Sequence, residues 1–291
     1  MEHQDRRACP FCGADASRPA PPYANRYADI EYRYWRCTAC ASHFIDPVPD
    51  AAQRAQLFDP ARYHASFYET VAQERYRSLA GRLAGYLRQG SRVLDYGCGN
   101  GQLLAALVER GLAPVGVEVS QVAADNAAAR SGCLVWPESD SRWRATQYDA
   151  VVMVDVIGHL ADPAATLRTI AATLRPGGIL CVEGTIEANP SLVGFVARSL
   201  AAAKRTRGHA EPAGFPPFDV NFATGPAQRA LFHRLGVPLV EREWRIFETG
   251  WPYRRNGAVR NAVALAAIAL SKLPPGRGRL GNKFFAVFER G

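Results

Sequence analysis

The sequence predicts an α/β protein with a mostly parallel sheet, preceded by a small zinc ribbon. Three observations predict this fold class. Between about residues 91 and 183, short apolar strands alternate with amphipathic helices, and right-handed crossovers make such a sheet mostly parallel. A glycine-rich turn joins the first of these strands to the first helix. Four cysteines ahead of them form two CxxC pairs, a spacing typical of structural zinc sites.

The composition is that of a soluble globular protein. The 291 residues are 48% hydrophobic and 21% charged, enough for one large domain plus a small one. Residues 258–273 are the most apolar stretch, but they are interrupted by charges and too short to span a bilayer. The first ten residues lack the apolar core of a signal peptide. We therefore expect a cytoplasmic protein without a transmembrane segment.

Composition shifts divide the chain into three parts. Pro47-Val48-Pro49 ends the cysteine-rich region and marks a natural boundary. A segment with helical apolar spacing follows, and then the alternating strands and helices begin. We expect a zinc-ribbon module at 1–50, a helical linker or lid at 51–90, and a main domain at 91–291 with substrate-covering insertions at about 186–222 and 249–281.

Periodicity and turn residues place the elements of the main domain. We expect strands at 92–94, 114–119, 133–136, 149–154, 179–183, 237–247 and 283–288. We expect helices at 102–110, 121–130, 163–174, 192–204, 226–235 and 259–270. The order of the first five strands predicts that their carboxyl ends meet at one edge of the sheet, where such sheets bind ligands.

The turn between the first strand and helix has the sequence Asp95-Tyr96-Gly97-Cys98-Gly99-Asn100-Gly101. Its glycines allow positive φ and close approach of a ligand, and the helix that follows points its N–H groups at the turn. A dinucleotide site uses GxGxxG to hold a pyrophosphate, whereas this turn is GxGxG with an acid two residues before it. Asp95 would repel a pyrophosphate, so the turn suits a ligand with an amino group.

This turn resembles motif I of the class I S-adenosylmethionine (SAM)-dependent methyltransferases. Three later segments match the family in order: a strand ending at Glu118, a strand followed by His159-Leu160, and the turn Arg175-Pro176-Gly177-Gly178 before the next strand. The resemblance covers about residues 87–183. It implies a Rossmann-like methyltransferase sheet, mostly parallel with an antiparallel late strand, and SAM as the methyl donor.

The resemblance also implies where the cofactor binds. In the family the acid at the position of Asp95 lies near the amino-acid part of SAM, and the acid at Glu118 accepts hydrogen bonds from the ribose hydroxyls. Trp136 either stacks on adenine or packs in the core, and both alternatives stay open. The expected cofactor-binding residues are Asp95, Gly97, Cys98, Gly99, Gly101, Glu118, Val119, Trp136 and Asp155.

His159 is the first candidate for a catalytic group. Methyl transfer requires alignment of the nucleophile with the methyl group and loss of a proton, and the pKa of histidine lies near working pH. The alternative is a histidine that only caps or packs under the next helix. Many relatives carry an acid directly before this histidine, but here Gly158 stands there. That departure leaves the role of the acid in doubt, with Asp155 as a partial substitute at a different position.

Two further histidines are candidate catalytic residues. His64 lies in the expected lid, and His209 lies in the expected insertion over the substrate. We expect the segment of His64 to close over the cofactor. We expect the insertion that contains His209 to cover the substrate, because loops at the carboxyl ends of parallel strands surround the ligand in such sheets.

Cys9, Cys12, Cys37 and Cys40 are the candidate metal ligands. Two CxxC pairs suit a closed, tetrahedral zinc site of structural type, whose metal supplies folding free energy to a region with little apolar content. A redox disulfide pair is the alternative. The other three cysteines, Cys98, Cys133 and Cys181, stand singly in apolar or glycine-rich surroundings and are expected in the core.

A zinc ribbon ahead of a SAM domain is similar to the arrangement in sugar and secondary-metabolite methyltransferases. We therefore expect a small-molecule acceptor: a sugar, a polysaccharide precursor or a secondary metabolite. An rRNA methyltransferase with a zinc-binding N-terminus is the alternative, since the net charge is +8, although the basic residues are scattered. A binding protein that has lost catalysis is a third hypothesis, suggested by Gly158. The methylated atom (O, N or C) and the oligomeric state stay open.

Overall fold

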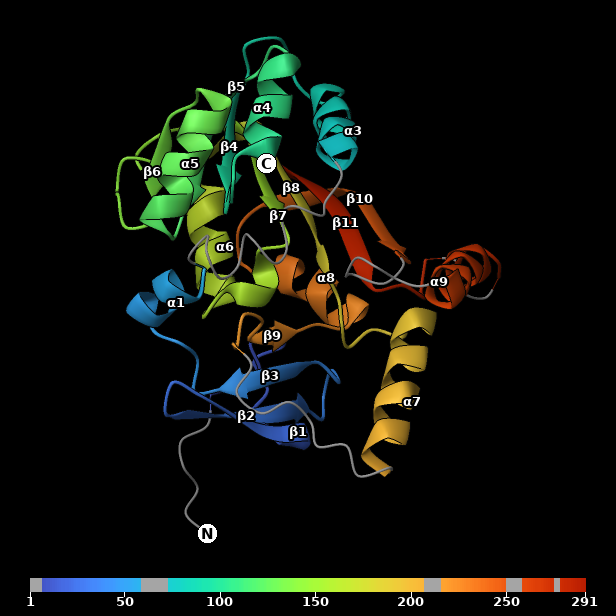
Figure 1. Cartoon of the computed structure of the whole chain (residues 1–291). Coiled ribbons are helices and arrows are strands. Elements are labelled where there is room, and N and C mark those ends of the chain that lie inside the picture. Colours follow the sequence, from blue (N-terminus) through green and yellow to red (C-terminus); the bar gives the residue numbers. More distant parts are fainter. Residues whose placement is uncertain (1–6, 59–72, 207–215, 250–257, 275–277) are drawn as a thin grey trace.

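The computed structural model describes residues 7–58, 73–206, 216–249, 258–274 and 278–291. These residues form two sheets, one of seven strands and one of four (Figure 1). Two of the candidate catalytic residues, His64 and His209, lie outside the described residues. Within the described part of the chain, no helix is both long and apolar enough to cross a membrane.

The large sheet has the strand order β10-β11-β8-β7-β4-β5-β6. Its strands are β4 (Arg92–Tyr96), β5 (Ala113–Glu118), β6 (Val135–Pro137), β7 (Tyr148–Val154), β8 (Leu174–Thr185), β10 (Leu239–Phe247) and β11 (Lys283–Arg290). Neighbouring strands from β8 to β6 pair in parallel, whereas β11 is antiparallel to both β8 and β10. The predicted mostly parallel sheet with an antiparallel late strand is confirmed.

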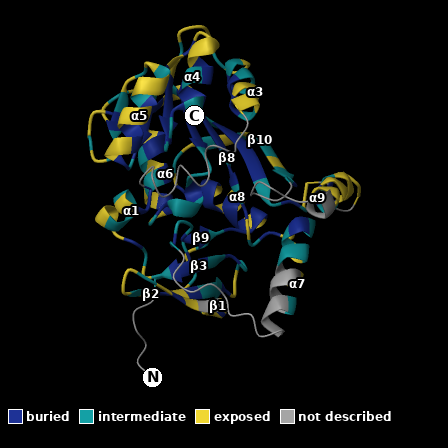
Figure 2. Cartoon of the chain, viewed as in Figure 1, coloured by how far each residue is buried: buried dark blue, intermediate teal, exposed yellow. Residues whose placement is uncertain are grey.

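Helices cover both faces of this sheet. They are α3 (Gln73–Ala84), α4 (Gln102–Glu109), α5 (Gln121–Ser131), α6 (Pro163–Ala172) and α8 (Gly225–His233). Leucines of α3 and α4 pack with one face of the sheet, and α6 and α8 pack with the other. Burial is concentrated in the sheet between them (Figure 2). The alternation of strands and helices along the chain therefore produces a three-layer domain with its core on both sheet faces.

Capping residues fix where the crossover helices begin. Ser120 accepts a hydrogen bond from the backbone of Ala123 at the start of α5. Asp162 does the same for α6, whose first residue is Pro163. These caps satisfy backbone N–H groups that have no partner inside the helix. Each helix therefore starts a few residues beyond a strand end, which leaves the strand ends open at one edge of the sheet.

The small sheet has the order β1-β2-β3-β9. Strands β1 (Ser17–Tyr27), β2 (Ile30–Cys37) and β3 (His43–Asp46) come from the N-terminal region, but β9 (Asn221–Phe222) comes from far along the chain. The sequence analysis placed the boundary of this module at residue 50 and missed β9, because a two-residue strand has no periodicity to detect. The region after β8 therefore completes the N-terminal sheet.

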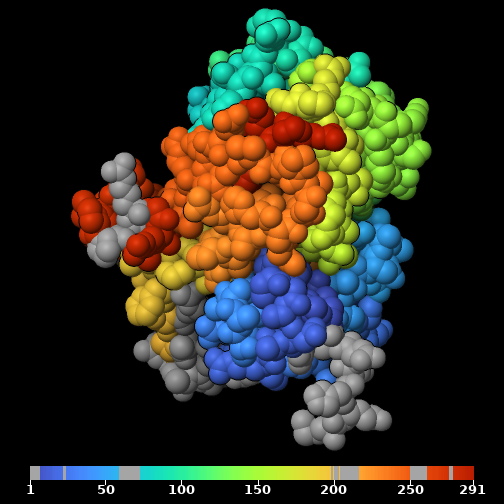
Figure 3. All heavy atoms as spheres, turned by 180° about the vertical axis from the view of Figure 1, so that it is seen from behind, coloured from blue at the N-terminus to red at the C-terminus, as the bar shows by residue number. Residues whose placement is uncertain are grey.

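The N-terminal module packs tightly against the large domain. Phe11 and Phe44 are buried in the same apolar cluster as Leu231 of α8, and the Arg234 guanidinium donates a hydrogen bond to the Pro10 carbonyl at 3.0 Å. The view from behind shows this N-terminal segment against the one that contains α8 and β10 (Figure 3). The module and the large domain thus share one continuous core.

Three more helices of the described residues lie outside the layers. The expected lid at 51–90 contains α1 (Ala51–Leu57) as well as α3. The expected insertions contain α7 (Leu192–Thr206) and α9 (Ala258–Ser271), which lie beside each other at one end of the molecule (Figure 1). The turn expected at 175–178 lies within the bounds of β8, where the pairing with β7 shifts register between Tyr148 and Ala150 and Gly177 has a φ of 73°.

Candidate functional site

A pocket with about 620 Å³ of empty space opens at the carboxyl ends of β4, β5 and β7. Four of the predicted cofactor residues line it, namely Gly97, Glu118, Val119 and Asp155, together with the candidate base His159. The sheet brings them together because parallel strands end at the same edge. The pocket lies where the sequence predicted a ligand.

The glycine turn forms one wall of the pocket. Gly97, Gly99 and Gly101 all have positive φ, at 77°, 55° and 78°. A Cβ on Gly97 would lie 2.5 Å from the Val156 Cγ2, and one on Gly101 would lie 2.8 Å from the Ala127 carbonyl oxygen. Backbone conformation and close packing therefore both require glycine at 97 and 101. No side chain caps the start of α4 at Gly101.

Two buried carboxylates, Asp95 and Glu118, stand at neighbouring strand ends. Glu118 accepts hydrogen bonds from the backbone N–H groups of Gly99 at 2.9 Å, Val119 at 2.8 Å and Ser120 at 3.3 Å. Burial raises its pKa although these three donors oppose the change. Glu118 thus holds the glycine turn closed against the end of β5.

Asp95 is only 2% exposed, and its Oδ2 has no hydrogen-bond partner among the described residues. Burial and the nearby charge of Glu118 raise its pKa to about 8. A buried carboxylate oxygen without a donor is costly, and an ammonium group beside it would offset that cost. Asp95 is not itself among the lining residues, but it directly precedes two of them, Tyr96 and Gly97. Its unbonded oxygen fits the amino group that the GxGxG turn predicted, which is the part of SAM expected there.

The other predicted cofactor residues lie behind the pocket wall. Trp136 is buried in the main core cluster and is not among the lining residues. Cys98 packs with Leu104 and Ala127 in a small cluster of its own. Of the two alternatives for Trp136, the structure has the ring packed in the core. Cys98, Gly99 and Gly101 contribute backbone to the turn rather than atoms to the lining.

Eight further lining residues are not among the predicted cofactor or catalytic residues. Two of them, Tyr96 in the glycine turn and Glu138, are bonded to each other, since the Tyr96 hydroxyl donates a 2.6 Å hydrogen bond to the Glu138 carboxylate. Arg54 and Phe58, from and just after α1, also line the pocket. No motif marks Arg54 or Phe58, although the capping box of Asp50 and Gln53 would have located α1. The helix that follows the N-terminal module therefore reaches the pocket directly.

Asp155 belongs to a cluster of charges at the pocket wall. The Lys283 ammonium donates to its two carboxylate oxygens at 2.8 and 2.9 Å, and the Arg75 guanidinium donates at 3.0 Å. Arg75 also pairs with Glu183. Burial would raise the pKa of Asp155, but the charges of Lys283 and Arg75 outweigh it and lower the pKa to about 2. Asp155 is thus an ionised structural partner rather than a proton acceptor.

His159 lies on a short 3₁₀ turn, η2 (Ile157–His159), and faces the pocket. Its Nδ1 is 2.9 Å from the Phe218 carbonyl oxygen and 3.1 Å from the Asp219 carboxylate. Both partners only accept hydrogen bonds, so Nδ1 carries the proton in the neutral ring and the basic lone pair is on Nε2. Burial disfavours the charged ring, but Asp219 more than offsets this, and the pKa of His159 lies above its usual value.

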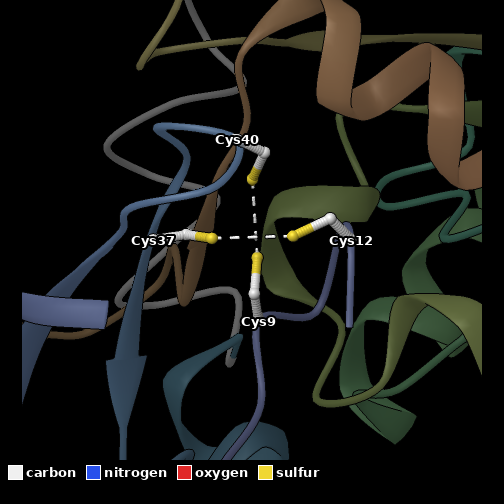
Figure 4. Close-up of side chains that lie close together, drawn as sticks. All are labelled: Cys9, Cys12, Cys37 and Cys40. Atoms are coloured by element: carbon white, nitrogen blue, oxygen red, sulfur yellow. Dashed lines mark hydrogen bonds between the residues drawn. The ribbon is translucent and has the colours of Figure 1, made fainter. Parts of the chain in front are cut away.

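The four predicted metal ligands converge on one point (Figure 4). Their sulfur atoms all lie within 4.8 Å of one another, with 3.6 Å between Cys9 and Cys40 and 3.5 Å between Cys12 and Cys37. Tetrahedral zinc with bonds of about 2.3 Å separates its sulfurs by about 3.8 Å, whereas a disulfide would bring two sulfurs to about 2.05 Å. The arrangement fits a four-thiolate metal site and contains no disulfide.

The comparisons with known proteins agree with this site. Residues 67–191 match a family model described as a methyltransferase domain. The chain is 34% identical over 109 residues to the ubiquinone biosynthesis O-methyltransferase of Aeromonas salmonicida, covering 35% of this chain and 45% of that protein. It is 29% identical over 175 residues to the protein of that name from Caulobacter vibrioides, covering 57% and 66%. The chain thus spans about half to two thirds of these relatives.

Among solved structures, the fold is similar to that of magnesium protoporphyrin IX methyltransferase from Synechocystis PCC 6803 with bound SAH. The TM-score is 0.50 at 14% identity, covering 75% of this chain and 83% of the other. This likeness concerns the fold alone. The segment matched by the family model contains the glycine turn, Glu118 and His159, so the resemblance predicted from these residues is confirmed for the central domain.

We predict that Asp95→Asn stabilises the empty protein at neutral pH while weakening SAM binding. The folded pKa of Asp95, about 8, lies above the unfolded value of 3.8. The folded state therefore holds the proton more tightly, and stability falls as pH rises through this window. The amide of the variant does not ionise, so the variant does not lose stability as pH rises through this window. A neutral amide also cannot form an ion pair with the ammonium group of SAM. Calorimetry gives the melting temperature, and titration with SAM gives the affinity.

Asp125→Asn is the matched control, because Asp125 is an exposed carboxylate on α5. It should change neither quantity. Wild-type SAM affinity in Asp95→Asn would contradict the assignment of the amino-acid end of SAM to Asp95.

Proposed function

We propose that this chain, whose residues 67–191 are a class I SAM-dependent methyltransferase domain, transfers a methyl group to a hydroxyl oxygen of a small-molecule acceptor. The observation that carries the proposal is the pairing of a SAM-type pocket with a histidine whose Nδ1 is held by two acceptors at the pocket rim. The relatives named O-methyltransferase support an oxygen acceptor. A sugar or another secondary metabolite with a free hydroxyl fits this description.

In this proposal Asp95 binds the amino group of SAM, and Glu118 accepts from its ribose hydroxyls while keeping its bonds to the turn. Bound SAM supplies a methyl group on a positively charged sulfur. Nε2 of His159 accepts the hydroxyl proton, because Nδ1 is committed to Phe218 and Asp219. Phe58 packs 5.0 Å from the His159 ring, centroid to centroid, which limits the rotation of the imidazole and excludes water on that side.

The charge of the pocket favours a small acceptor over RNA. The titratable residues that line it are Arg54, Tyr96, Glu118, Glu138, Asp155 and His159. Phosphate backbones bind to clusters of lysine and arginine, and Arg54 is the one lysine or arginine among these lining residues. A neutral polyhydroxyl or aromatic hydroxyl compound needs no such cluster.

Replacing His159 should remove the base and spare the cofactor. We expect His159→Gln to lower kcat for methylation about 10²- to 10⁴-fold with little change in SAM affinity, since the cofactor contacts lie on β4 and β5. The measurement is transfer of labelled methyl from SAM to a panel of catechols, phenols and sugar nucleotides. Unchanged kcat on an accepted compound would refute the role of His159, and no transfer to any hydroxyl compound by wild type would refute an oxygen acceptor.

The four cysteines suit a structural zinc ion, with Cys9, Cys12, Cys37 and Cys40 as its ligands. All four side chains are held in turns, since Gly13 N–H donates to the Cys9 carbonyl and Ala41 N–H donates to the Cys37 carbonyl. The metal would hold the N-terminal sheet together without touching the pocket. It supplies folding free energy and takes no part in methyl transfer.

We predict that the purified protein contains about one zinc ion per chain, as four thiolates bind one metal. Cys12→Ser should lose that metal and lower the melting temperature, because the remaining three thiolates no longer close the site. Elemental analysis and thermal unfolding measure the two effects. The control is Cys133→Ser, a partly buried cysteine outside the cluster, which should keep the metal. Wild-type metal content in Cys12→Ser would contradict the assignment.

A further inference from the structure

We propose that Asp219 is a positioning residue for His159, and that Gly158 exists to make room for it. The proposal deepens the proposed function, since it rests on His159 as the group that takes the acceptor proton. Many class I relatives have an acid directly before this histidine, and its absence here left the role of an acid open. In the structure an acid from a distant segment occupies the missing side chain's place.

The Asp219 carboxylate lies where a side chain at position 158 would lie. A Cβ on Gly158 would lie 2.6 Å from the Asp219 Oδ1, and that same oxygen is 3.1 Å from the His159 Nδ1. A Cβ at position 158 would therefore displace the Asp219 carboxylate from its observed place. Gly158 does not have positive φ, so the backbone itself does not require glycine there. Glycine at 158 instead leaves the space in which the carboxylate lies.

The backbone on both sides of Asp219 is fixed to η2 and the residue after it. Val220 N–H donates to the Gly158 carbonyl at 2.8 Å, and the Asn221 side-chain amide donates to the Leu160 carbonyl at 2.6 Å. The preceding residue, Phe218, accepts from His159. Each residue from 218 to 221 thus contacts the turn that carries His159, which gives the carboxylate a fixed direction.

The N-terminal module holds this segment from the other side. Strand β9 pairs with β3, with Phe44 opposite Asn221 and His43 opposite Phe222, and Ile45 N–H donates to the Val220 carbonyl at 3.0 Å. The Arg7 guanidinium binds the Val220 carbonyl at 3.1 Å and the Asn221 Oδ1 at 2.9 Å.

The cysteine turn itself adds two bonds just beyond β9. Thr224 N–H donates to the Ser42 hydroxyl oxygen at 3.1 Å, and the Thr224 hydroxyl donates to the Cys40 carbonyl at 3.1 Å. The four-cysteine module is therefore the scaffold that delivers Asp219 to His159. This gives the module a place in the reaction site although its cysteines lie outside the pocket.

Three carboxylates face His159 from the elements around it: Asp219, Asp155 after β7, and Glu187 after β8. Asp155 is neutralised by Lys283 and Arg75. Burial and the Asp219 charge raise the pKa of Glu187, which favours its neutral form. Asp219 is thus the carboxylate that acts most directly on the ring, and its removal should lower the pKa of His159 because burial then acts with less opposition.

The test uses two variants that perturb the pair from opposite sides. Asp219→Asn keeps the shape and removes the charge, and Gly158→Ala displaces the carboxylate while leaving it in the chain. In protein labelled with ¹⁵N-histidine, the pKa of His159 should fall by about one unit or more in Asp219→Asn and should also fall in Gly158→Ala. The acidic limb of the kcat/KM profile should move to lower pH in parallel, with SAM affinity unchanged.

Asp125→Asn again serves as the control for the change in net charge and should leave the pKa of His159 at its wild-type value. An unchanged pKa of His159 in both Asp219→Asn and Gly158→Ala would overturn the proposal. Because the NMR titration needs no turnover, it tests the Asp219–His159 pair separately from the proposed function. If the pKa of His159 falls in the two variants but the wild-type protein neither binds SAM nor transfers methyl, the proposed function is refuted and the Asp219–His159 pair stands.

Discussion

The site depends on the desolvation of two carboxylates that the parallel sheet places side by side. Strands β4 and β5 pair with Asp95 opposite Gly116 and Tyr96 opposite Val117, so Glu118 ends one strand next to the turn that ends the other. The Glu118 carboxylate accepts hydrogen bonds from three backbone N–H groups, one in the glycine turn and two in the residues directly after Glu118. Asp95 keeps an oxygen without a partner among the described residues. The glycine turn at the open edge of the sheet thus lies between a carboxylate whose hydrogen bonds are made and one that keeps an unbonded oxygen.

A second constraint ties the reaction side of the pocket to the N-terminal module. The segment around Asp219 is too short and irregular to hold its own position, and it is fixed by β3, Arg7 and the turn of Cys40. The segment directly after this module supplies Arg54 and Phe58 to the pocket wall. The proposed cofactor residues thus lie on the sheet, while His159 depends on contacts between segments separated by more than 170 residues in sequence. The four-cysteine cluster does not line the pocket, yet its module is in this way connected to a group within it.

The sequence predicted the sheet and the glycine turn well because both are local. A strand, a glycine turn and a helix in succession determine where Asp95 lies, and strand alternation determines where Glu118 lies. The two CxxC pairs likewise bring their sulfurs together through short turns. What the sequence could not predict comes from long-range packing. The position of Trp136 in the core and the ion pairs of Asp155 depend on neighbours from other elements.

The largest gap concerned the acid beside His159. Gly158 indicates a missing group, and Asp155 is the nearest substitute that the sequence offers. No pattern connects residue 219 to residue 159, because strand β9 has two residues and its partner strand lies in the N-terminal region. A glycine at a position where relatives carry a side chain thus also indicates that a side chain from another segment occupies that space. His64 and His209 remain predictions, since they lie outside the described residues.

Proton release on SAM binding tests the account most directly. With a pKa of about 8, Asp95 is mostly protonated at pH 7 in the empty protein, and an ammonium group bound beside it should ionise it. Isothermal titration with SAM in buffers of different ionisation enthalpy measures the protons exchanged. The account predicts release of close to one proton per SAM at pH 7, absent in Asp95→Asn. SAM binding without proton release, or no binding at all, would contradict it.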